Sequence, residues 1–425
     1  MDIKSILDSL QGCPCGRPHN FDTERVEIGR GLVHRVGDIL AESNFPKNIL
    51  LVADDNTLGV SEGLLASLKK NGFHVKKLIY DDMKYARAEQ VEEIEGLAAD
   101  CEGIISVGTG SLNDICRVAA FRKEKDYCIF ATAPSMDGFA SDTAPIVQNS
   151  FKSSWQAKQP RIIIGDTEIL AASPAELKSA GFGDMMAKYI GLVDWHIARI
   201  LIDEYYCEKV AAITEEAIRR IVALADNITG SDPEAAGAVM EALVLTGLAM
   251  KLAACSRPAS GSEHIISHYL ECHKVIADIW PDYHGKKVGV ATVYCNRIYR
   301  NIAERCLTVK AVKDPTDWDV VYTKFHERLH SDVRRLNSPT ITDLVDPALL
   351  EEKWDEIRNL ILTILPDDAT MMKLMRTAGA ATEPEDVNVS RELFTDSIRF
   401  SPYMRDRITL LRLLPMLGID AVDYL

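Results

Sequence analysis

GIISVGTGSLNDICRVAAF, residues 103–121, joins a short apolar run to a glycine-rich turn and then to an amphipathic segment. The run GIISVG predicts a buried strand, and SLNDICRVAAF predicts a helix that begins directly after the turn. Glycines let the backbone approach an anion closely, and the free N–H groups at a helix start bind phosphate oxygens. Asn113 occupies the third glycine position of the dinucleotide fingerprint G-x-G-x-x-G. A plain glycine turn before a helix is therefore an equal alternative to a phosphate-binding turn.

The same alternation of strand and helix continues on both sides of this stretch. Further strands are predicted at NILLVAD (48–54), HVKKLIY (74–80), DYCIFATAP (126–134) and RIIIGD (161–166). TLGVSEGLLASLKKNG, closed by Gly72, and ARAEQVEEIEGLAAD predict helices between them. Strands that alternate with helices indicate a parallel sheet covered on both faces, so we expect a Rossmann-like α/β domain over residues 1–172.

The pattern changes from about Ser173, where ASPAEL supplies a Ser-Pro helix start. Strand-like runs almost vanish, and long amphipathic stretches follow, such as EEAIRRIVALADNI, AAGAVMEALVLTGLAMKLAA and PALLEEKWDEIRNLILTIL. We therefore expect an all-α domain over residues 173–425.

The overall charge excludes some classes of partner. The chain of 425 residues carries 63 acidic against 48 basic residues, for a net charge of -15. A uniformly acidic surface repels nucleic acid and anionic membranes. No secretory signal and no run of membrane-spanning length is visible, so a cytoplasmic protein is expected. The ten cysteines lie mostly in apolar runs, as reduced core thiols do. Cys13, Cys15 and His19 form a C-x-C-x3-H cluster without a second ligand pair, which favours an ordered turn over a zinc site.

Two further segments lie where parallel strands end. Asp54 closes NILLVAD, where a carboxylate can accept both hydroxyls of a cofactor ribose and would repel the extra phosphate of NADP. A helix cap before Thr57 is the alternative, and Asp55 could serve equally well. ATAPSMDGFASDTAPI (131–146) is dense in small residues and should open onto a cleft with Asp137 and several hydroxyls; a purely structural loop is the alternative.

A constellation of acids and histidines lies in the helical part. Asp184 is in SAGFGDMMAKY, His264 and His268 are in SGSEHIISHYLE, and His284 is in DYHGKKVGVAT. One carboxylate with two imidazoles can hold zinc, nickel or ferrous iron and leave positions open for substrate. Paired polar residues on a helix face are the structural alternative. His273 and His196 compete with these histidines by spacing.

These residues resemble one known family. GTGSLND, TAPSMDGFAS, GFGDMMAKY, SGSEHIISH and HGKKVGVAT are similar to motifs of the glycerol-1-phosphate dehydrogenase family, in its bacterial arabinose-operon-linked branch. That family belongs to the superfamily of iron-containing alcohol dehydrogenases and dehydroquinate synthase-like proteins. The matches span residues from about 50 to 290. The sequence departs from the wider pattern at Arg117, where many members have Lys, and at Met136, where archaeal members have His.

The resemblance implies a role for each matching residue. Asp184, His264 and His284 would bind one divalent metal (zinc, nickel or iron), and Asp184 would also touch substrate. Asp137 and His268 would contact substrate and act in catalysis, which takes His268 out of the metal shell. The residues that would contact NAD(H) or NADP(H) are Asp54, Gly110, Ser111, Leu112, Asn113, Asp114, Thr132, Ala133, Pro134, Ser135 and Ser141.

The reaction that the resemblance implies is the reversible reduction of dihydroxyacetone phosphate to sn-glycerol 1-phosphate, a step of phospholipid metabolism. Arg257 and Lys188 are candidates for the substrate phosphate, unless each pairs with a nearby carboxylate. The alternatives are a dehydroquinate synthase-like lyase, another polyol or alcohol dehydrogenase of the superfamily, or a ligand sensor on a degenerate scaffold. Large apolar helical segments make a homodimer the expected assembly.

Overall fold

The computed structural model describes residues 2–148 and 151–425. Within these ranges, its first part is built on a parallel sheet with strand order β1-β8-β5-β4-β2-β3. The strands are β1 (Arg25–Gly29), β2 (Asn48–Asp54), β3 (His74–Tyr80), β4 (Gly103–Gly108), β5 (Asp126–Ala131) and β8 (Ile162–Asp166). Since all neighbours are parallel, the carboxyl ends of β2, β4 and β5 meet at one edge.

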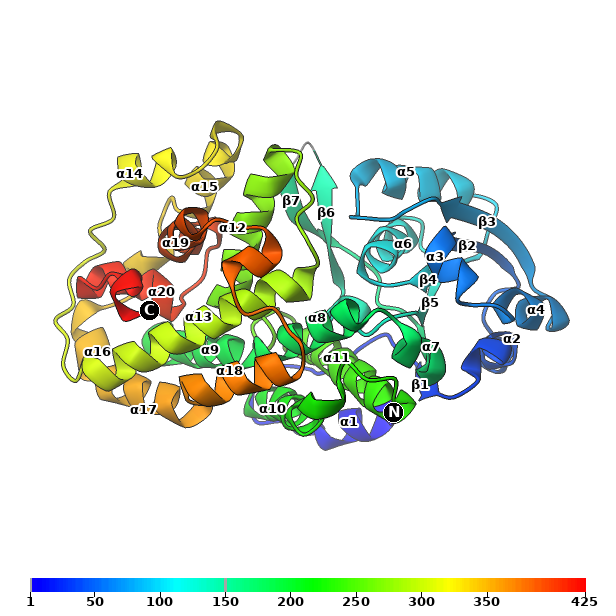
Figure 1. Ribbon diagram of the computed structural model, residues 1–425, viewed down its shortest axis with the longest axis horizontal. Helices are drawn as coiled ribbons and strands as arrows, with labels where there is room; N and C mark the ends of the chain where they lie inside the picture. The colour runs from blue at the N-terminus through cyan, green and yellow to red at the C-terminus, as the bar shows by residue number, and fades with distance from the viewer. Residues whose placement is uncertain (1, 149–150) are drawn as a thin grey trace.

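Side chains of the central strands alternate between two apolar layers. Leu50 and Val52 of β2 pack with α5 (Ala88–Leu97) and α6 (Gly110–Arg122), whereas Ile49 and Leu51 pack with α2 (Val36–Glu42) and α4 (Leu64–Lys70). This alternation is what a sheet covered on both faces requires. The predicted Rossmann-like α/β fold is confirmed (Figure 1).

The structure differs from the sequence-based expectation in three places within the sheet part. β1, with the sequence RVEIG, was not predicted because charged residues interrupt its apolar pattern at the sheet edge. The helix expected between β2 and β3 is split into α3 (Asp55–Gly59) and α4, because Gly63 lies between them with φ at 96°. The predicted loop 131–146 ends in a strand, β6 (Thr143–Gln148), which pairs antiparallel with β7 (Phe151–Gln156).

The rest of the chain is helical, as predicted. After α7 (Thr167–Ala172), the longer helices are α8 (Ala175–Met186), α9 (Lys188–Ile202), α10 (Glu208–Val222), α11 (Pro233–Ala253), α12 (Ser262–Ile276), α13 (His284–Arg305), α17 (Trp354–Ile364), α18 (Asp368–Thr377) and α19 (Arg391–Phe400). Shorter ones are α1 (Ile3–Ser9), α14 (Trp318–Thr323), α15 (His330–Leu336), α16 (Pro347–Glu352) and α20 (Leu410–Leu413). Figure 1 shows the β6–β7 ribbon beside α12, between the sheet and the helical part.

One helix is longer and more apolar than the sequence analysis allowed. By length and composition α11 could cross a membrane, so the expectation that no segment reaches that length is wrong. However, 78% of its most apolar window is buried inside the protein. Its residues Met240, Val244 and Leu248 pack against the sheet layer of α5 and α6. We therefore assign α11 as a core helix that joins the two parts of the chain.

Candidate active site

Asp184, His264 and His284 come together from three helices, α8, α12 and α13. One ligand atom of each lies within 4.8 Å of the others. Nε2 of His264 is 3.6 Å from Oδ1 of Asp184, and the rings of His264 and His284 are 5.2 Å apart between centroids. The structure thus assembles the three residues that the resemblance implies as metal ligands.

Close helix packing brings these groups together. A Cβ atom at Gly285, the second residue of α13, would lie 2.0 Å from the carbonyl oxygen of Ala180 in α8. A Cβ atom at Gly181 would lie equally close, 2.0 Å, to the carbonyl oxygen of Pro134 in the loop after β5. The glycines of GFGDMMAKY and HGKKVGVAT therefore have a steric reason: they let α8 contact both α13 and the sheet edge.

The protonation states of the three groups suit a divalent metal. Burial opposes ionisation of Asp184, but the charge of Lys188 outweighs it and the pKa of Asp184 falls to about 2. Burial lowers the pKa of His264 to about 4 and that of His284 to about 3. At neutral pH the set is one carboxylate and two neutral imidazoles, which is the donor set of a catalytic zinc-type site with open positions.

Glu263 orients the first of these imidazoles. Its Oε1 is 2.6 Å from Nδ1 of His264 and also accepts the backbone N–H of Gly261 at 2.9 Å. A proton on Nδ1 leaves the Nε2 lone pair directed toward Asp184. An imidazole that binds a metal commonly donates its other ring N–H to a carboxylate in this way.

Lys188 joins the metal-ligand cluster to the sheet edge. Its ammonium is 2.8 Å from Oδ1 of Asp184 and 2.6 Å from Oδ2 of Asp137. Asp137 also donates its backbone N–H to Oδ2 of Asp184, at 3.0 Å. Because Lys188 is fully buried between two carboxylates, its charge is already compensated and does not suit the substrate phosphate.

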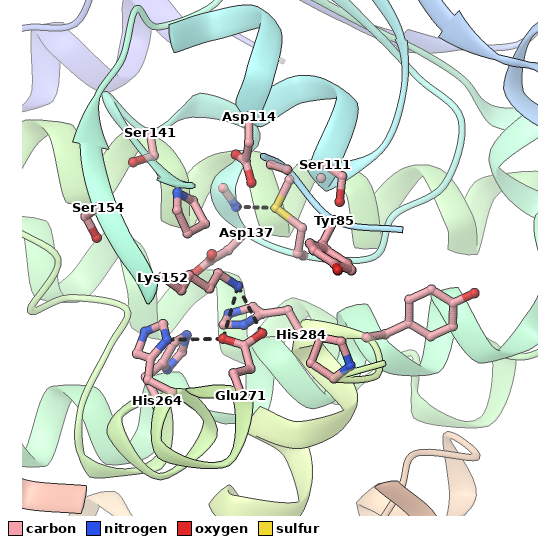
Figure 2. Close-up of a pocket in the computed structure, with 18 of the residues that line it drawn as sticks. Tyr85, Ser111, Asp114, Asp137, Ser141, Lys152, Ser154, His264, Glu271 and His284 are labelled. Carbon is pink, nitrogen blue, oxygen red and sulfur yellow. Dashed lines mark hydrogen bonds and ion pairs between the residues drawn. The ribbon is translucent and has the colours of Figure 1, made fainter. Parts of the chain in front are cut away.

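His268 lines the same cavity outside the ligand cluster. Its Nδ1 is 3.3 Å from Oε2 of Glu271, whose carboxylate also binds Lys152 of β7 at 2.9 Å and Lys287 of α13 at 2.8 Å. The rings of His268 and His284 are 6.2 Å apart. Figure 2 shows the Lys152–Glu271 pair beside the histidines, facing Ser111, Asp114 and Ser141 across the pocket.

The cavity has a volume of about 280 Å³ and lies between the sheet edge and the helical part. Of the residues predicted to contact nucleotide, Gly110, Ser111, Asp114, Ser135 and Ser141 line it. Leu112, Asn113, Thr132, Ala133 and Pro134 do not. Asn113 has a structural task instead, since its side-chain oxygen accepts the hydroxyl of buried Tyr127 at 2.7 Å.

Asp54 lies at the end of β2, which pairs in parallel with β4 and so places it beside the glycine turn. Its Oδ1 accepts the backbone N–H of Thr57 at 2.8 Å, and a reciprocal bond completes a capping box on α3. The helix-cap alternative is therefore correct for Asp54. A ribose contact through its second carboxylate oxygen is compatible with that cap and stays a prediction, since Asp54 does not line the cavity.

Arg117, one of the two departures from the wider pattern, supports the loop after β5. Its guanidinium pairs with Asp114 at 2.6 Å and donates to the carbonyl oxygens of Gly138 at 2.7 Å and Ser141 at 2.9 Å. It is 1% exposed, so it acts by fixing this loop next to the glycine turn.

Two arginines near the end of the chain line the cavity and were not predicted. Within the described residues, neither Arg405 nor Arg407 has a carboxylate at ion-pair distance. Arg407 donates to Ser256 and Ser260 of the SRPASG stretch. Burial, with repulsion from Arg257 and Arg405, lowers the pKa of Arg407 to about 10. Cations without a carboxylate partner suit the binding of an anion.

The remaining sequence candidates lie elsewhere. Arg257 is bound by Glu204, with 2.5 Å between the closest atoms, and donates to the carbonyl oxygen of Ile408, so its charge is compensated as the alternative foresaw. His273 packs on Tyr269, and His196 stacks on Tyr206. Neither histidine belongs to the metal-ligand cluster.

Known proteins share this architecture. Residues 27–174 match the family described as iron-containing alcohol dehydrogenase. A probable glycerol dehydrogenase from Sinorhizobium meliloti has a similar fold, with a TM-score of 0.62 at 16% identity over 94% of this chain and 97% of that one. A sulfoacetaldehyde reductase from Bifidobacterium kashiwanohense, solved in complex with NAD+, has a TM-score of 0.62 at 15% identity over the same shares, 94% and 97%.

Fold and site therefore define the class of the iron-containing alcohol dehydrogenases. Two more similar relatives are named glycerol-1-phosphate dehydrogenase (NAD(P)+). The one from Bacillus velezensis is 31% identical over 85% of this chain and 83% of its own length. The one from Methanosarcina barkeri is 34% identical over 63% of this chain and 74% of its own length. The chain belongs to the glycerol-1-phosphate dehydrogenase family, as the sequence motifs predicted.

Proposed function

We propose that the protein is an NAD(P)-dependent sn-glycerol-1-phosphate dehydrogenase, which reversibly reduces dihydroxyacetone phosphate. The observation that carries this proposal is the convergence of Asp184, His264 and His284 within 4.8 Å, in a cleft whose opposite wall is the glycine turn before α6. A relative that is 34% identical over 63% of this chain bears the name of this activity.

The nucleotide would lie along the sheet edge. Gly110 and Ser111 at the start of α6 line the cavity, and the free N–H groups of a helix start suit the pyrophosphate. Ser135 and Ser141 offer hydroxyls from the loop after β5, and Asp54 offers a carboxylate oxygen for the ribose. We propose these contacts for NAD(H) or NADP(H), with Asp54 favouring NAD(H).

A metal held by Asp184, His264 and His284 would supply a Lewis acid that polarises the ketone oxygen, while the nicotinamide would supply the hydride. The chain itself fixes the geometry around the reacting carbon. Glu263 holds the His264 ring, and Lys188 pairs with both Asp137 and Asp184, which reduces the repulsion between these two groups beside the substrate. The nearby loop and helices exclude bulk water from these buried groups.

His268 is positioned to move a proton. Its Nδ1 faces the carboxylate of Glu271, which orients the ring and leaves Nε2 for substrate or water. Lys152 and Lys287 keep Glu271 ionised, because their charges lower its pKa well below the usual range although burial opposes this. We propose that His268 relays the proton to or from the substrate oxygen and that Asp137 contacts the substrate.

The substrate phosphate needs cations without a partner in this acidic protein. Arg405 and Arg407 line the cavity, and no carboxylate of the described residues pairs with either. We propose that these arginines bind the phosphate, in place of Arg257 and Lys188. A planar guanidinium matches phosphate oxygens in a bidentate manner.

The activity is tested with chelator-stripped protein reloaded with zinc, nickel or ferrous iron. Dihydroxyacetone phosphate and NADH or NADPH are added, and the absorbance of the reduced cofactor is followed. We expect consumption of one cofactor per substrate, and a product that an sn-glycerol-3-phosphate-specific dehydrogenase does not oxidise. A dehydroquinate synthase-like lyase would consume no reduced cofactor, and an unspecific polyol dehydrogenase would prefer unphosphorylated dihydroxyacetone.

We also expect a cytoplasmic homodimer. Light scattering on the purified protein should then give twice the chain mass of 47.1 kDa. A monomer mass at micromolar concentration would contradict this expectation.

A further inference from the structure

A second group of metal-binding side chains lies outside the active site. Cys13, Cys15 and His19 of the N-terminal segment meet Cys207, which is almost two hundred residues away in the sequence. One ligand atom of each lies within 4.8 Å of all the others. The C-x-C-x3-H cluster therefore has a fourth candidate ligand, Cys207, which only the three-dimensional fold brings to it.

The distances within this cluster suit one ion with four ligands. Sγ of Cys13 is 3.5 Å from Sγ of Cys207, and Nε2 of His19 is 3.1 Å from Sγ of Cys15 and 3.6 Å from Sγ of Cys207. In a tetrahedral zinc site, with Zn–S of about 2.3 Å and Zn–N of about 2.0 Å, neighbouring ligand atoms are separated by about 3.5 to 3.8 Å. All ten cysteines are free thiols in this structure.

The surroundings orient His19 and Cys15. Nδ1 of His19 is 2.8 Å from the carbonyl oxygen of Leu252, so a proton on Nδ1 leaves the Nε2 lone pair facing the sulfurs. Tyr205 donates its hydroxyl to Sγ of Cys15 at 3.5 Å. Cys207 is the N-cap residue of α10.

The backbone brings the ligands of the N-terminal segment together. Gly16, with φ at 77°, turns the chain directly after Cys15 and brings His19 back toward it.

We propose that Cys13, Cys15, His19 and Cys207 bind a structural zinc ion, distinct from the metal of the active site. With four protein ligands the site is closed, as structural zinc sites are. The ion would fasten the N-terminal segment to α10 and to the end of α11. The same segment already packs there through Leu10 and through a bond from Lys209 to the carbonyl oxygen of Ser9, and it leads directly into β1 of the sheet.

The test separates the two metals by emptying the active site. The full-length His264→Ala variant is purified anaerobically without chelator, and its zinc is measured by mass spectrometry. We expect one zinc per chain in this variant and none after Cys15→Ser and Cys207→Ser are added to it. Cys306→Ser, at a half-buried thiol outside the cluster, serves as the matched control and should keep the zinc.

Two further measurements on folded His264→Ala protein guard against misfolding of the cysteine variants. Cobalt loading should give the near-ultraviolet charge-transfer band of cobalt–thiolate bonds, which a carboxylate–imidazole site lacks. An organomercurial that blocks thiols should release the zinc stoichiometrically. The proposal is overturned if the His264→Ala protein neither holds nor takes up zinc, if the double cysteine variant retains it, or if a disulfide joins Cys13 to Cys207 in the anaerobic protein.

Discussion

The backbone N–H of Asp137 donates a hydrogen bond to the buried carboxylate of Asp184, over 3.0 Å. Asp137 lies in the loop after β5, and Asp184 lies in α8 of the helical part. The sheet side and the helical side of the cleft are therefore joined at the residue proposed to touch both metal and substrate. Displacements at this joint should affect metal binding and catalysis together.

Replacing Gly285 with alanine tests the packing beneath this joint. The added Cβ would lie 2.0 Å from the carbonyl oxygen of Ala180, so α13 must move away from α8 and carry His284 with it. We expect the metal affinity to fall about 10- to 100-fold, as for lost outer support of a metal ligand. Gly96→Ala is the control, because no atom lies within 4 Å of its added Cβ. Equal metal affinities in the two variants would contradict the packing account.

Lys188→Met tests the charge balance between Asp137 and Asp184. The variant leaves two buried carboxylates without their cation, which destabilises metal-free protein by about 3 to 5 kcal/mol. Urea unfolding should show a smaller loss when metal is present, because a divalent cation replaces the missing charge. Adding Asp137→Asn should recover part of the stability. A loss that is the same with and without metal would refute this role.

Arg405→Ala tests the phosphate site. Loss of a hydrogen bond to a charged group, about 1.5 to 3 kcal/mol, corresponds to a rise of about 10- to 100-fold in KM for dihydroxyacetone phosphate. The kcat/KM for unphosphorylated dihydroxyacetone should stay unchanged. Arg399→Ala, at an exposed arginine paired with Asp420, is the control. If both substrates lose activity equally, Arg405 does not discriminate the phosphate.

Asp194 gives a pH dependence of stability with a defined sign. It accepts the backbone N–H groups of Ser262 and Leu410 and the hydroxyl of Tyr299, yet burial raises its pKa to about 6 from 3.8. Between pH 3.8 and about 6 this carboxyl takes up a proton on folding, so its contribution to stability grows as the pH falls from about 6 toward 3.8. Relative to Asp194→Asn, the wild type should gain about 3 kcal/mol over this range. A constant difference in unfolding free energy would show that Asp194 is not perturbed.

The sequence predicts most of the sheet because the central strands are runs of apolar residues. NILLVAD and GIISVG occupy the bounds of the central strands β2 and β4, and HVKKLIY occupies those of the edge strand β3. RVEIG, the strand β1, was not predicted because an edge strand needs only part of this apolar pattern. The split between α3 and α4 was not predicted, because the sequence does not distinguish a glycine in the left-handed conformation from a glycine tolerated inside a helix.

Residues of the candidate site were predictable from the sequence only where they lie in recognisable motifs. The resemblance chose His264 and His284 among several histidines, and the structure brings both to Asp184. Arg405 and Arg407 lie more than a hundred residues after HGKKVGVAT, the last of these motifs, and have no motif around them. Cys207 likewise has no partner nearby in the sequence. Only the tertiary fold places the two arginines in the active-site cavity and Cys207 beside Cys13, Cys15 and His19.

The central claim is that Asp184, His264 and His284 hold the catalytic metal while His268 acts on the substrate. The most direct test measures active-site metal and NADH oxidation with dihydroxyacetone phosphate in wild type, His264→Ala and His268→Ala. All three proteins also carry Cys15→Ser and Cys207→Ser, so that only the active-site metal is counted. We predict that His264→Ala loses metal and activity together, whereas His268→Ala keeps the metal and loses about 100-fold or more in rate. Equal metal content and activity in wild type and His264→Ala would contradict the account.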